Sequence, residues 1–405
     1  MQPHKCTGFR KNKGFGGKIR MIDRERLAET FKFLVEIDSV SKQERAICVE
    51  LKKMFQTFGA DIFIDDTGEK VGGECGNLII KIMGDVDSPP ILFAAHMDTV
   101  EPGRGIKAVL KNGVFTSDGT TILGADDKSA IAILLEALRI IKEKNIQHGP
   151  LEIVITVCEE IGLLGVRHLD FDLLKARYGY ALDTSDTESI VTRAPAANRI
   201  ELTVYGKDAH AGVEPEKGIN AISIAGKAIA SIESGRIDHE TTCNIGLIKG
   251  GKATNIVPDF VTVNCEARSH NKKKLDNVTN GIISAFKKAV YEYKTSPDQE
   301  LPRLRTLKEN DFPLTSIPEN HYIIRLARRA SENLGRKIKT KHIGGGSDAN
   351  VFFQKGIVTG VLGTGMHKVH TMRESISIDD MVKTTELVIE IIKMHSADTV
   401  AGRDI

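Results

Sequence analysis

The chain has 405 residues, of which 41% are hydrophobic and 27% charged, the balance of a globular protein with two or three domains. This composition excludes a disordered or collagen-like chain, and no apolar run reaches the ~20 residues needed to cross a bilayer. The net charge is +2, but residues 1–20 carry six basic side chains and no acid, so the remainder has 50 basic against 54 acidic residues.

Residues 1–20 are therefore expected to be a basic disordered tail. A nucleic-acid arm and a transit segment are the alternatives, and an extended gene start is a third explanation of the tail. With an acidic body and few aromatic residues, we expect neither a nucleic-acid partner nor a membrane partner. The six cysteines form no Cys-x-x-Cys pair, and several lie in apolar runs, which indicates a reducing cytoplasm and no zinc–thiolate site.

In chain order, the hydrophobic pattern first predicts helices and strands in alternation. The segment 21–58 is helical, and strands follow at 77–82 and 90–95. A buried helix is expected at 128–144, and strands at 151–157 and 178–182. Such alternation predicts an α/β domain whose mixed central sheet is covered by helices on both faces.

The pattern changes after about residue 192. Strands are expected at 199–205, 242–247, 258–267 and 301–306, with helices at 220–234 and 272–293, which is the order of a ferredoxin-like α+β sandwich. Helices at 319–334 and 379–395 and a strand at 357–362 then resume the first pattern. We therefore expect a discontinuous first domain at 21–193 and 312–405, with residues 194–311 inserted as a lid or dimerisation domain.

Histidines and acids follow the predicted strands of the first domain. Ligands of an open α/β sheet bind beyond the carboxyl ends of its strands. A lone acid in such a place is usually a cap, but several on one edge are harder to dismiss. Imidazole and carboxylate ligands suit zinc, manganese or cobalt, and two metals sharing one carboxylate would activate water and polarise a carbonyl. The residues concerned are His96, Asp98, Asp126, Asp127, Glu159, Glu160, Asp183, His367 and His370.

The segments around these residues resemble the di-zinc exopeptidase family that includes peptidase T, carboxypeptidase G-type enzymes, aminoacylases and succinyl-diaminopimelate desuccinylase. The motifs are Ala95-His96-Met97-Asp98-Thr99-Val100, Gly124-Ala125-Asp126-Asp127-Lys128, Glu159-Glu160-Ile161-Gly162, Asp183 and His370-Thr371-Met372-Arg373-Glu374. The resemblance covers the chain after Met21 and is closest to peptidase T, because of the segment 121–128.

The resemblance implies a role for each motif. Two divalent metal ions, zinc above cobalt or manganese, are bridged by Asp126. His96 and Asp183 complete one site, and Glu160 and His370 the other. Glu159 is then the general base, and Asp98 orients His96. Spacing alone does not decide between Glu159 and Glu160, and His367 competes with His370, which the family pattern favours through Glu374. The family also has a cis peptide bond here, between Asp126 and Asp127.

The resemblance gives roles in the inserted domain as well. His210 stabilises the oxyanion, often from the partner subunit of a homodimer, although from the residues alone it is a surface turn histidine. Asn255 and Arg268 match substrate-binding positions, and either could be a turn residue or surface charge. The loop with Gly345 and Ser347 is assigned to the substrate backbone, and its alternative is a flexible loop in which Ser347 or Asp348 caps a helix.

These features predict a metal-dependent aminopeptidase that hydrolyses short peptides, tripeptides above all, as a cytoplasmic homodimer. The sequence His210-Ala211-Gly212 departs from the His-Pro-Gly common in tripeptidases. A carboxypeptidase, aminoacylase or other deacylase with the same metal site is therefore the alternative. A non-catalytic binding protein is a third hypothesis, which the competent residue at every core position disfavours.

Overall fold

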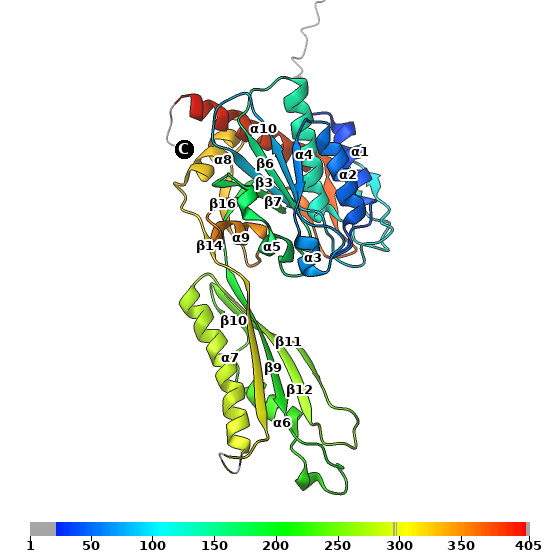
Figure 1. Ribbon diagram of the computed structural model, residues 1–405, viewed down its shortest axis with the longest axis vertical. Helices are drawn as coiled ribbons and strands as arrows, with labels where there is room; N and C mark the ends of the chain where they lie inside the picture. The colour runs from blue at the N-terminus through cyan, green and yellow to red at the C-terminus, as the bar shows by residue number, and fades with distance from the viewer. Residues whose placement is uncertain (1–21, 295, 297, 402–405) are drawn as a thin grey trace, which may run out of the picture.

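The computed structural model describes residues 22–401 apart from 295 and 297. The predicted tail, 1–20, lies outside the described residues. Figure 1 shows a wide α/β lobe and a narrow second lobe that projects from it. Within the described part of the chain, no helix is both long and apolar enough to span a bilayer.

A nine-stranded mixed sheet forms the centre of the wide lobe. Its strand order is β1-β2-β6-β3-β7-β16-β8-β14, and β15 pairs with β8. The central strands β6, β3, β7 and β16 are parallel to their neighbours within this group. The strands are β1 (Asp61–Ile64), β2 (Leu78–Ile82), β3 (Ile91–His96), β6 (Leu151–Thr156), β7 (Tyr178–Thr184), β8 (Ser189–Ala194), β14 (Thr315–Ser316), β15 (Lys339–His342) and β16 (Val358–Gly363).

Helices cover both faces of this sheet, as predicted. In β3, Ile91, Phe93 and Ala95 belong to one buried cluster, whereas Leu92 and Ala94 belong to another, because successive side chains of a strand point to opposite faces. The first cluster includes α1 (Arg24–Val35), α2 (Arg45–Gln56), α4 (Ala125–Glu143), α8 (Tyr322–Asn333) and α10 (Ile378–Val400); the second includes α5 (Leu164–His168) and α9 (Asp348–Gln354). Helix α3 (Thr67–Val71) contacts α5.

The narrow lobe has its own sheet and core. Five strands lie in the order β10-β11-β12-β9-β13, and two helices pack on one face of the sheet. This is the ferredoxin-like arrangement predicted from the sequence. Its elements are β9 (Ala196–Tyr205), α6 (Ala221–Ala230), β10 (Gly235–Asp238), β11 (Thr241–Gly250), β12 (Phe260–Ser269), α7 (Lys272–Tyr293) and β13 (Arg303–Phe312), with a short 3-10 helix at Pro215–Lys217. The precise domain limits of 194 and 311 stay a prediction.

Two features differ from the expected elements. The helical segment 21–58 is two helices, because residues 36–44 form a turn with Lys42 at φ 75°; Asp38, Ser39 and Ser41 favour such turns by bonding to local backbone. A small sheet was also missed: β4 (Val109–Lys111), β5 (Val114–Thr116), β17 (Met366–His367) and β18 (Ser375–Ser377), in the order β17-β18-β5-β4. A short 3-10 helix at Phe171–Leu173 lies between α5 and β7.

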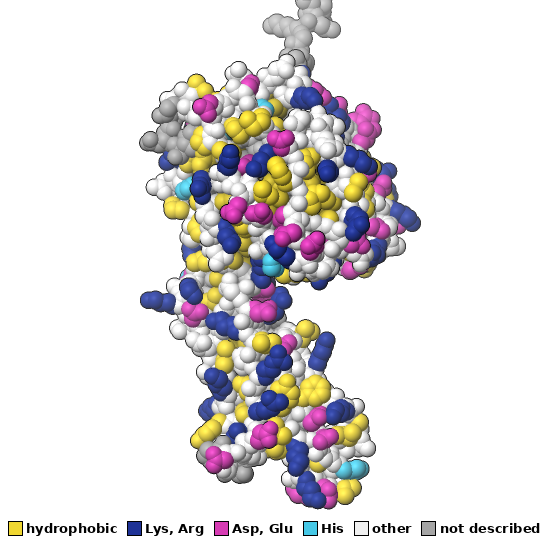
Figure 2. All heavy atoms as spheres, in the orientation of Figure 1, with side chains coloured by type: hydrophobic (Ala, Val, Ile, Leu, Met, Phe, Trp, Pro, Cys, Tyr) yellow, Lys and Arg dark blue, Asp and Glu magenta, His cyan; other side chains and the backbone are white. Residues whose placement is uncertain are grey.

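Charged side chains are mixed over the visible surface. Figure 2 shows basic and acidic groups interleaved over this face of both lobes, without a continuous basic stripe. A groove that follows a nucleic-acid backbone needs such a stripe. This face therefore offers no obvious path for a polyanion.

Candidate metal centre

Four neighbouring strands deliver the predicted ligands to one edge of the main sheet. His96 is the last residue of β3, Glu159 and Glu160 follow β6, and Asp183 lies near the end of β7. The segment that follows β16 carries His370. Because these four strands are parallel, their carboxyl ends meet at the same edge. The fold therefore places these residues at one edge of the sheet, and their role as ligands stays a prediction.

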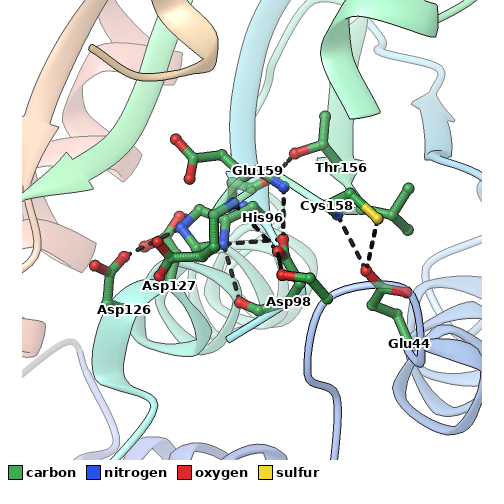
Figure 3. A network of polar contacts seen from close by, with 12 residues as sticks. Glu44, His96, Asp98, Asp126, Asp127, Thr156, Cys158 and Glu159 are labelled. Atoms are coloured by element: carbon green, nitrogen blue, oxygen red, sulfur yellow. Dashed lines mark hydrogen bonds and ion pairs between the residues drawn. The ribbon is translucent and has the colours of Figure 1, made fainter. Parts of the chain in front are cut away.

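Asp126 lies at the centre of this group, at the start of α4. Its Oδ1 is 3.1 Å from Nε2 of His96, and its Oδ2 is 3.2 Å from Nε2 of His370. The same His370 nitrogen is 2.9 Å from Oε1 of Glu160. Ligand atoms of His96, Asp126 and Glu160 all lie within 4.8 Å of one another. One carboxylate thus faces two histidines through its two different oxygens, and Figure 3 shows its approach to His96.

His370, rather than His367, reaches the acidic group. It lies in the turn between β17 and β18 with φ 60°, whereas His367 belongs to β17; both histidines are exposed. Glu374 holds this turn against the start of α4, because its carboxylate accepts backbone N–H groups of Leu123, Gly124 and Asp126 at 2.8, 2.9 and 3.0 Å. The peptide bond between Asp126 and Asp127 is cis, as the resemblance implies.

Asp98 makes contacts that the sequence did not reveal. The Nδ1 atom of His96 lies 3.0 Å from the backbone carbonyl of Asp98 and 3.5 Å from its carboxylate. The shorter contact identifies the carbonyl as the main partner of the ring. The carboxylate instead accepts the backbone N–H groups of Glu159 at 2.9 Å and Glu160 at 3.2 Å, and the hydroxyl of Ser41 at 2.6 Å. Asp98 therefore fixes both glutamates as well as the histidine, and Figure 3 shows its position beside His96 and Glu159.

Burial raises the pKa of three acids of this site, whereas hydrogen bonds to His370 and His96 hold the pKa of Asp126 below its usual range against the effect of burial. Burial raises the pKa of Glu159 well above the usual range, and the pKa of Glu160 rises for the same reason. Burial and the charge of Asp126 raise the pKa of Asp183 well above its usual range. Hydrogen bonds to Asp126 and Glu160 raise the pKa of His370 to about 10. Concentrated negative charge of this kind calls for compensating cations.

His210 and Asn255 are not brought to this group within one chain. Both are exposed in the narrow lobe, where Ala211 donates its N–H to the carbonyl of Asn255 at 2.9 Å. His210 follows β9, which starts beside the main sheet and runs ten residues away from it, a distance of about 33 Å. Figure 1 shows the segment between β9 and α6 at the far end of the lobe.

Arg268 lies at the junction of the two lobes, beside the glycine loop. Its guanidinium donates to the Glu266 carboxylate at 2.7 and 2.8 Å and to the carbonyl of Gly344 at 3.0 Å. It also lies over the ring of Phe312, with 5.3 Å between the guanidinium carbon and the ring centroid. A cavity of about 510 Å³ opens here. Its charged and histidine lining residues are Arg193, Arg236, His239, Glu240, Glu266, Arg268, His270 and His342.

The glycine loop leads directly into α9. Ser347 is the N-cap of this helix, and its N–H donates to the side chain of Asn350 at 3.0 Å; the capping alternative is thus observed. A Cβ atom on Gly346 would lie 2.6 Å from the Phe312 ring, so only glycine fits there, whereas Gly345 has open space around it. A substrate contact by Gly345 or Ser347 stays a prediction.

Two buried groups beside the site carried no clear signal in the sequence. Asp348 is 5% exposed, and its carboxylate accepts the hydroxyl of Thr156 at 2.5 Å; burial raises its pKa to about 7. Lys128 is fully buried with its ammonium 2.6 Å from the carbonyl of Ile37, and burial lowers its pKa to about 7. The available signal for Lys128 was its charge within a largely apolar helix. Asp348 lies at the start of a helix, where a carboxylate is normally interpreted as a cap.

Two family descriptions match parts of the chain. The "Peptidase dimerisation domain" of the M20 peptidases matches residues 196–294, which form most of the narrow lobe. "Peptidase family M28" matches residues 77–214. That range contains His96, Asp126, Glu159, Glu160 and Asp183. Both matches thus describe peptidases.

Relatives match over almost the whole length. The chain is 43% identical to an uncharacterized Bacillus subtilis protein, YqjE, over 92% of this chain and 99% of that one. The crystal structure of aminopeptidase PepT from Bacillus cereus is 43% identical, with a TM-score of 0.84, and that of a Staphylococcus aureus tripeptidase is 37% identical, with a TM-score of 0.87. Each covers 93% of this chain and is itself covered completely.

Proposed function

Since the chain belongs to the peptidase T-like group of the M20 peptidases, we propose that it is a metal-dependent aminopeptidase that removes the first residue of tripeptides. The observation that carries the proposal is Asp126, whose two carboxylate oxygens lie about equally close to His96 and His370, at 3.1 and 3.2 Å. This arrangement suits a carboxylate that bridges two cations.

The donor set fits two divalent metal ions. His96, Asp126 and Asp183 would hold one ion, and Asp126, Glu160 and His370 the other, with zinc the first choice for such nitrogen and carboxylate donors. The pKa values of Glu160 and Asp183 are raised by burial, and positive charge would allow these acids to ionise. When bound, such ions polarise the scissile carbonyl and generate a nucleophile from water at neutral pH.

Glu159 is the proposed general base. Its side chain is buried beside His96, and its backbone N–H is held by Asp98 at 2.9 Å. A carboxylate in this position accepts a proton from the attacking water at a side-chain oxygen and returns it to the departing amine. Asp98 is a positioning residue, because it holds Glu159 and Glu160 through their backbone and contacts the His96 ring.

Arg268 supports the choice of short peptides. A free C-terminal carboxylate in the junction cavity would meet the guanidiniums of Arg193, Arg236 and Arg268, and arginine binds carboxylates in a bidentate manner. A cavity of about 510 Å³ accommodates a small ligand and not a folded protein. Recognition of the carboxylate would thus limit the length of the substrate.

The test combines Glu159→Gln, Glu159→Ala and a substrate panel. We expect both variants to lose hydrolysis of Ala-Ala-Ala while retaining the metal content of the unmodified protein, measured by mass spectrometry of the elements. Glu309→Gln, at an exposed position of β13, is the matched control and should remain active. Wild-type turnover by Glu159→Gln would refute the role of the base. Hydrolysis of N-acyl amino acids or dipeptides in preference to tripeptides would show that the protein is one of the other amidohydrolases with this metal site and not a tripeptidase.

We further propose that the active form is a cytoplasmic homodimer in which His210 serves the partner's site. The β11 residues Leu247 and Ile248 are 56% and 53% exposed, and β10 pairs with β11 only at residues 241–243, which leaves an apolar edge suited to a second copy. Co-expression of His210→Ala with Glu159→Gln should restore activity that neither variant has alone, because the mixed dimer contains one complete site. Failure of a verified mixed dimer would place His210 elsewhere.

A further inference from the structure

Side chains from other segments of the chain hold the turn that carries Glu159. The four consecutive backbone N–H groups of residues 157–160 each donate to a side-chain oxygen. Asn77 accepts the first at 3.1 Å, Glu44 the second at 3.0 Å, and Asp98 the third and fourth at 2.9 and 3.2 Å. All three accepting residues are fully buried. The position of this turn therefore depends on three buried side chains that lie far from it in the sequence.

The contact of Glu44 with Cys158 fixes an unusual backbone conformation. Cys158 has a φ of 52°, in the left-handed region that residues other than glycine seldom adopt. Such a conformation persists only where the surrounding structure determines it. The Oε1 atom of Glu44 accepts the N–H of Cys158 at 3.0 Å and lies 3.4 Å from its thiol, as Figure 3 shows. Because Cys158 directly precedes Glu159, its backbone conformation sets the direction of the proposed base.

Glu44 is itself anchored in the turn between α1 and α2. Its Oε1 atom also accepts the N–H of Lys42 at 2.9 Å, within that turn. The hydroxyl of Ser41, from the same turn, donates to the carboxylate of Asp98 at 2.6 Å. The turn before α2 therefore supplies one acceptor to the segment that carries Glu159 and supports a second one.

We propose that Glu44 is a positioning residue of the peptidase, because its Oε1 atom fixes the backbone of Cys158 and thereby the direction of the Glu159 side chain. Glu44 acts through the backbone of Cys158 and not on the reacting atoms. The inference rests on the proposed function, in which Glu159 is the general base. It adds a third segment of the chain, the turn before α2, to the groups on which catalysis depends.

The two carboxylate oxygens of Glu44 have different surroundings, which allows the hydrogen bond to be separated from the charge. Oε1 accepts two backbone N–H groups, whereas Oε2 is buried without a hydrogen-bond partner among the described residues. In Glu44→Gln the amide oxygen can keep the place of Oε1, and the NH2 group then takes the place of Oε2. Burial raises the pKa of Glu44, which lowers the cost of this neutral replacement. Glu44→Asp keeps the charge, but its side chain is one methylene too short to reach the same N–H.

Loss of the Oε1 contact should lower kcat with little change in KM. Glu44→Ala leaves the N–H of the buried Cys158 without its acceptor, so the turn can move. A misplacement of about 1 Å in an active site can cost about 100-fold in rate. We therefore expect kcat to fall by about 10- to 100-fold in Glu44→Ala and Glu44→Asp, and by less than about 10-fold in Glu44→Gln. KM should change little, because Glu44 does not line the junction cavity proposed to hold the substrate carboxylate.

The experiment compares Glu44→Ala, Glu44→Asp and Glu44→Gln in the metal-loaded full-length protein, with the exposed Glu309→Ala as control. Thermal melts and metal content first show that each variant is folded and loaded, and kcat and KM are then measured with Ala-Ala-Ala. Hydrogen exchange followed by mass spectrometry reports on the amides of residues 157–160 without any substrate. We expect faster exchange of this segment in the alanine and aspartate variants, and exchange close to that of the wild type in Glu44→Gln. Cys158→Ala, which removes the thiol and keeps the N–H, should lose much less activity than Glu44→Ala.

Three results would overturn the positioning role. These are wild-type kcat in folded, metal-loaded Glu44→Ala, unchanged exchange of residues 157–160 in that variant, and activity retained by Glu44→Asp but lost by Glu44→Gln, which would indicate an effect of charge. If Glu44→Ala does not fold, the comparison of the aspartate and glutamine variants decides. A wild-type protein that does not cleave tripeptides would instead refute the proposed function. Because exchange is measured without substrate, the two failures are distinguishable.

Discussion

Removal of the Glu374 carboxylate should destabilise the start of α4 more than any change of charge at the surface. Glu374 is 1% exposed, and its two oxygens accept three backbone N–H groups, from Leu123, Gly124 and Asp126, at 2.8–3.0 Å. Its contact with these residues joins segments about 250 positions apart in the chain. The side chain therefore joins the His370 turn to Asp126, the proposed bridging aspartate.

The magnitude follows from the number of donors. Each buried donor left without a partner costs about 1–3 kcal/mol, so three donors set a range of about 3–9 kcal/mol for Glu374→Ala. Water can enter the cavity that the substitution creates and satisfy part of this loss, so we expect about 3–5 kcal/mol. In Glu374→Gln the amide oxygen still accepts two N–H groups, but the amide NH2 group faces the third N–H and cannot accept it. We therefore expect the free energy of unfolding to fall by about 1–3 kcal/mol.

The assay is urea unfolding of the metal-free protein, followed by circular dichroism, with Glu309→Ala and Glu309→Gln as exposed controls. We expect free energies of unfolding in the order wild type, Glu374→Gln, Glu374→Ala. Zinc affinity, measured by chelator competition, should fall about 10- to 100-fold in Glu374→Gln, as for other groups that orient a metal ligand. A Glu374→Ala value within about 0.5 kcal/mol of the Glu309→Ala control would refute the reasoning.

Three further outcomes are expected. Arg268→Lys should raise KM for tripeptides by about 10-fold with little change in kcat, because lysine cannot reproduce a bidentate contact; an equal loss with a C-terminally amidated tripeptide would contradict carboxylate recognition. Asp98→Asn should lower kcat by about 10- to 100-fold without unfolding the protein, because the amide NH2 group of asparagine would face the N–H of Glu159 or Glu160. An unchanged kcat would argue against the positioning role of Asp98. Burial lowers the pKa of His395, which contacts Tyr322 and the Pro89 carbonyl. Below pH ~6.5 the unfolded chain therefore binds more protons than the folded chain does. The free energy of unfolding should then fall by at most about 1.4 kcal/mol for each pH unit of acidification. Thermal melts of His395→Gln should lose that part of the acid sensitivity.

The position of the proposed ligands at one edge could be predicted because the carboxyl ends of parallel strands lie at the same edge of the sheet. His96, Glu160 and Asp183 each follow a largely apolar run, and the carboxyl ends of such strands meet at one edge. The hydrophobic pattern also predicted the long buried helix α4, because apolar residues cover most of the surface of this helix. The narrow lobe was also predictable, since its strands and helices alternate in a recognisable order.

The contacts that orient the ligands could not be predicted in this way. Glu374 lies in a turn between strands of two and three residues, β17 and β18, which are too short to carry a period of two. Asp98 was expected to orient His96 through its carboxylate, but the carbonyl is closer to the ring, and the carboxylate holds the backbone of Glu159 and Glu160. The partner of a carboxylate depends on where loop N–H groups point, and hydrophobic patterns contain no information on that.

The proposed role of His210 could not be predicted from the pattern of one chain, because it depends on a second copy of the protein. From the residues alone it is a surface histidine in a turn, and in the structure of one chain it is exposed in the segment between β9 and α6, which lies at the far end of the narrow lobe (Figure 1). The proposed metal ligands depend on strands of a single sheet, so one chain suffices to bring them together. The ten residues of β9 carry His210 about 33 Å from that edge, and in the proposed homodimer a second copy would supply this donor. The mixed-dimer experiment with His210→Ala and Glu159→Gln therefore tests the part of the proposed mechanism that neither sequence periodicity nor a single chain can address.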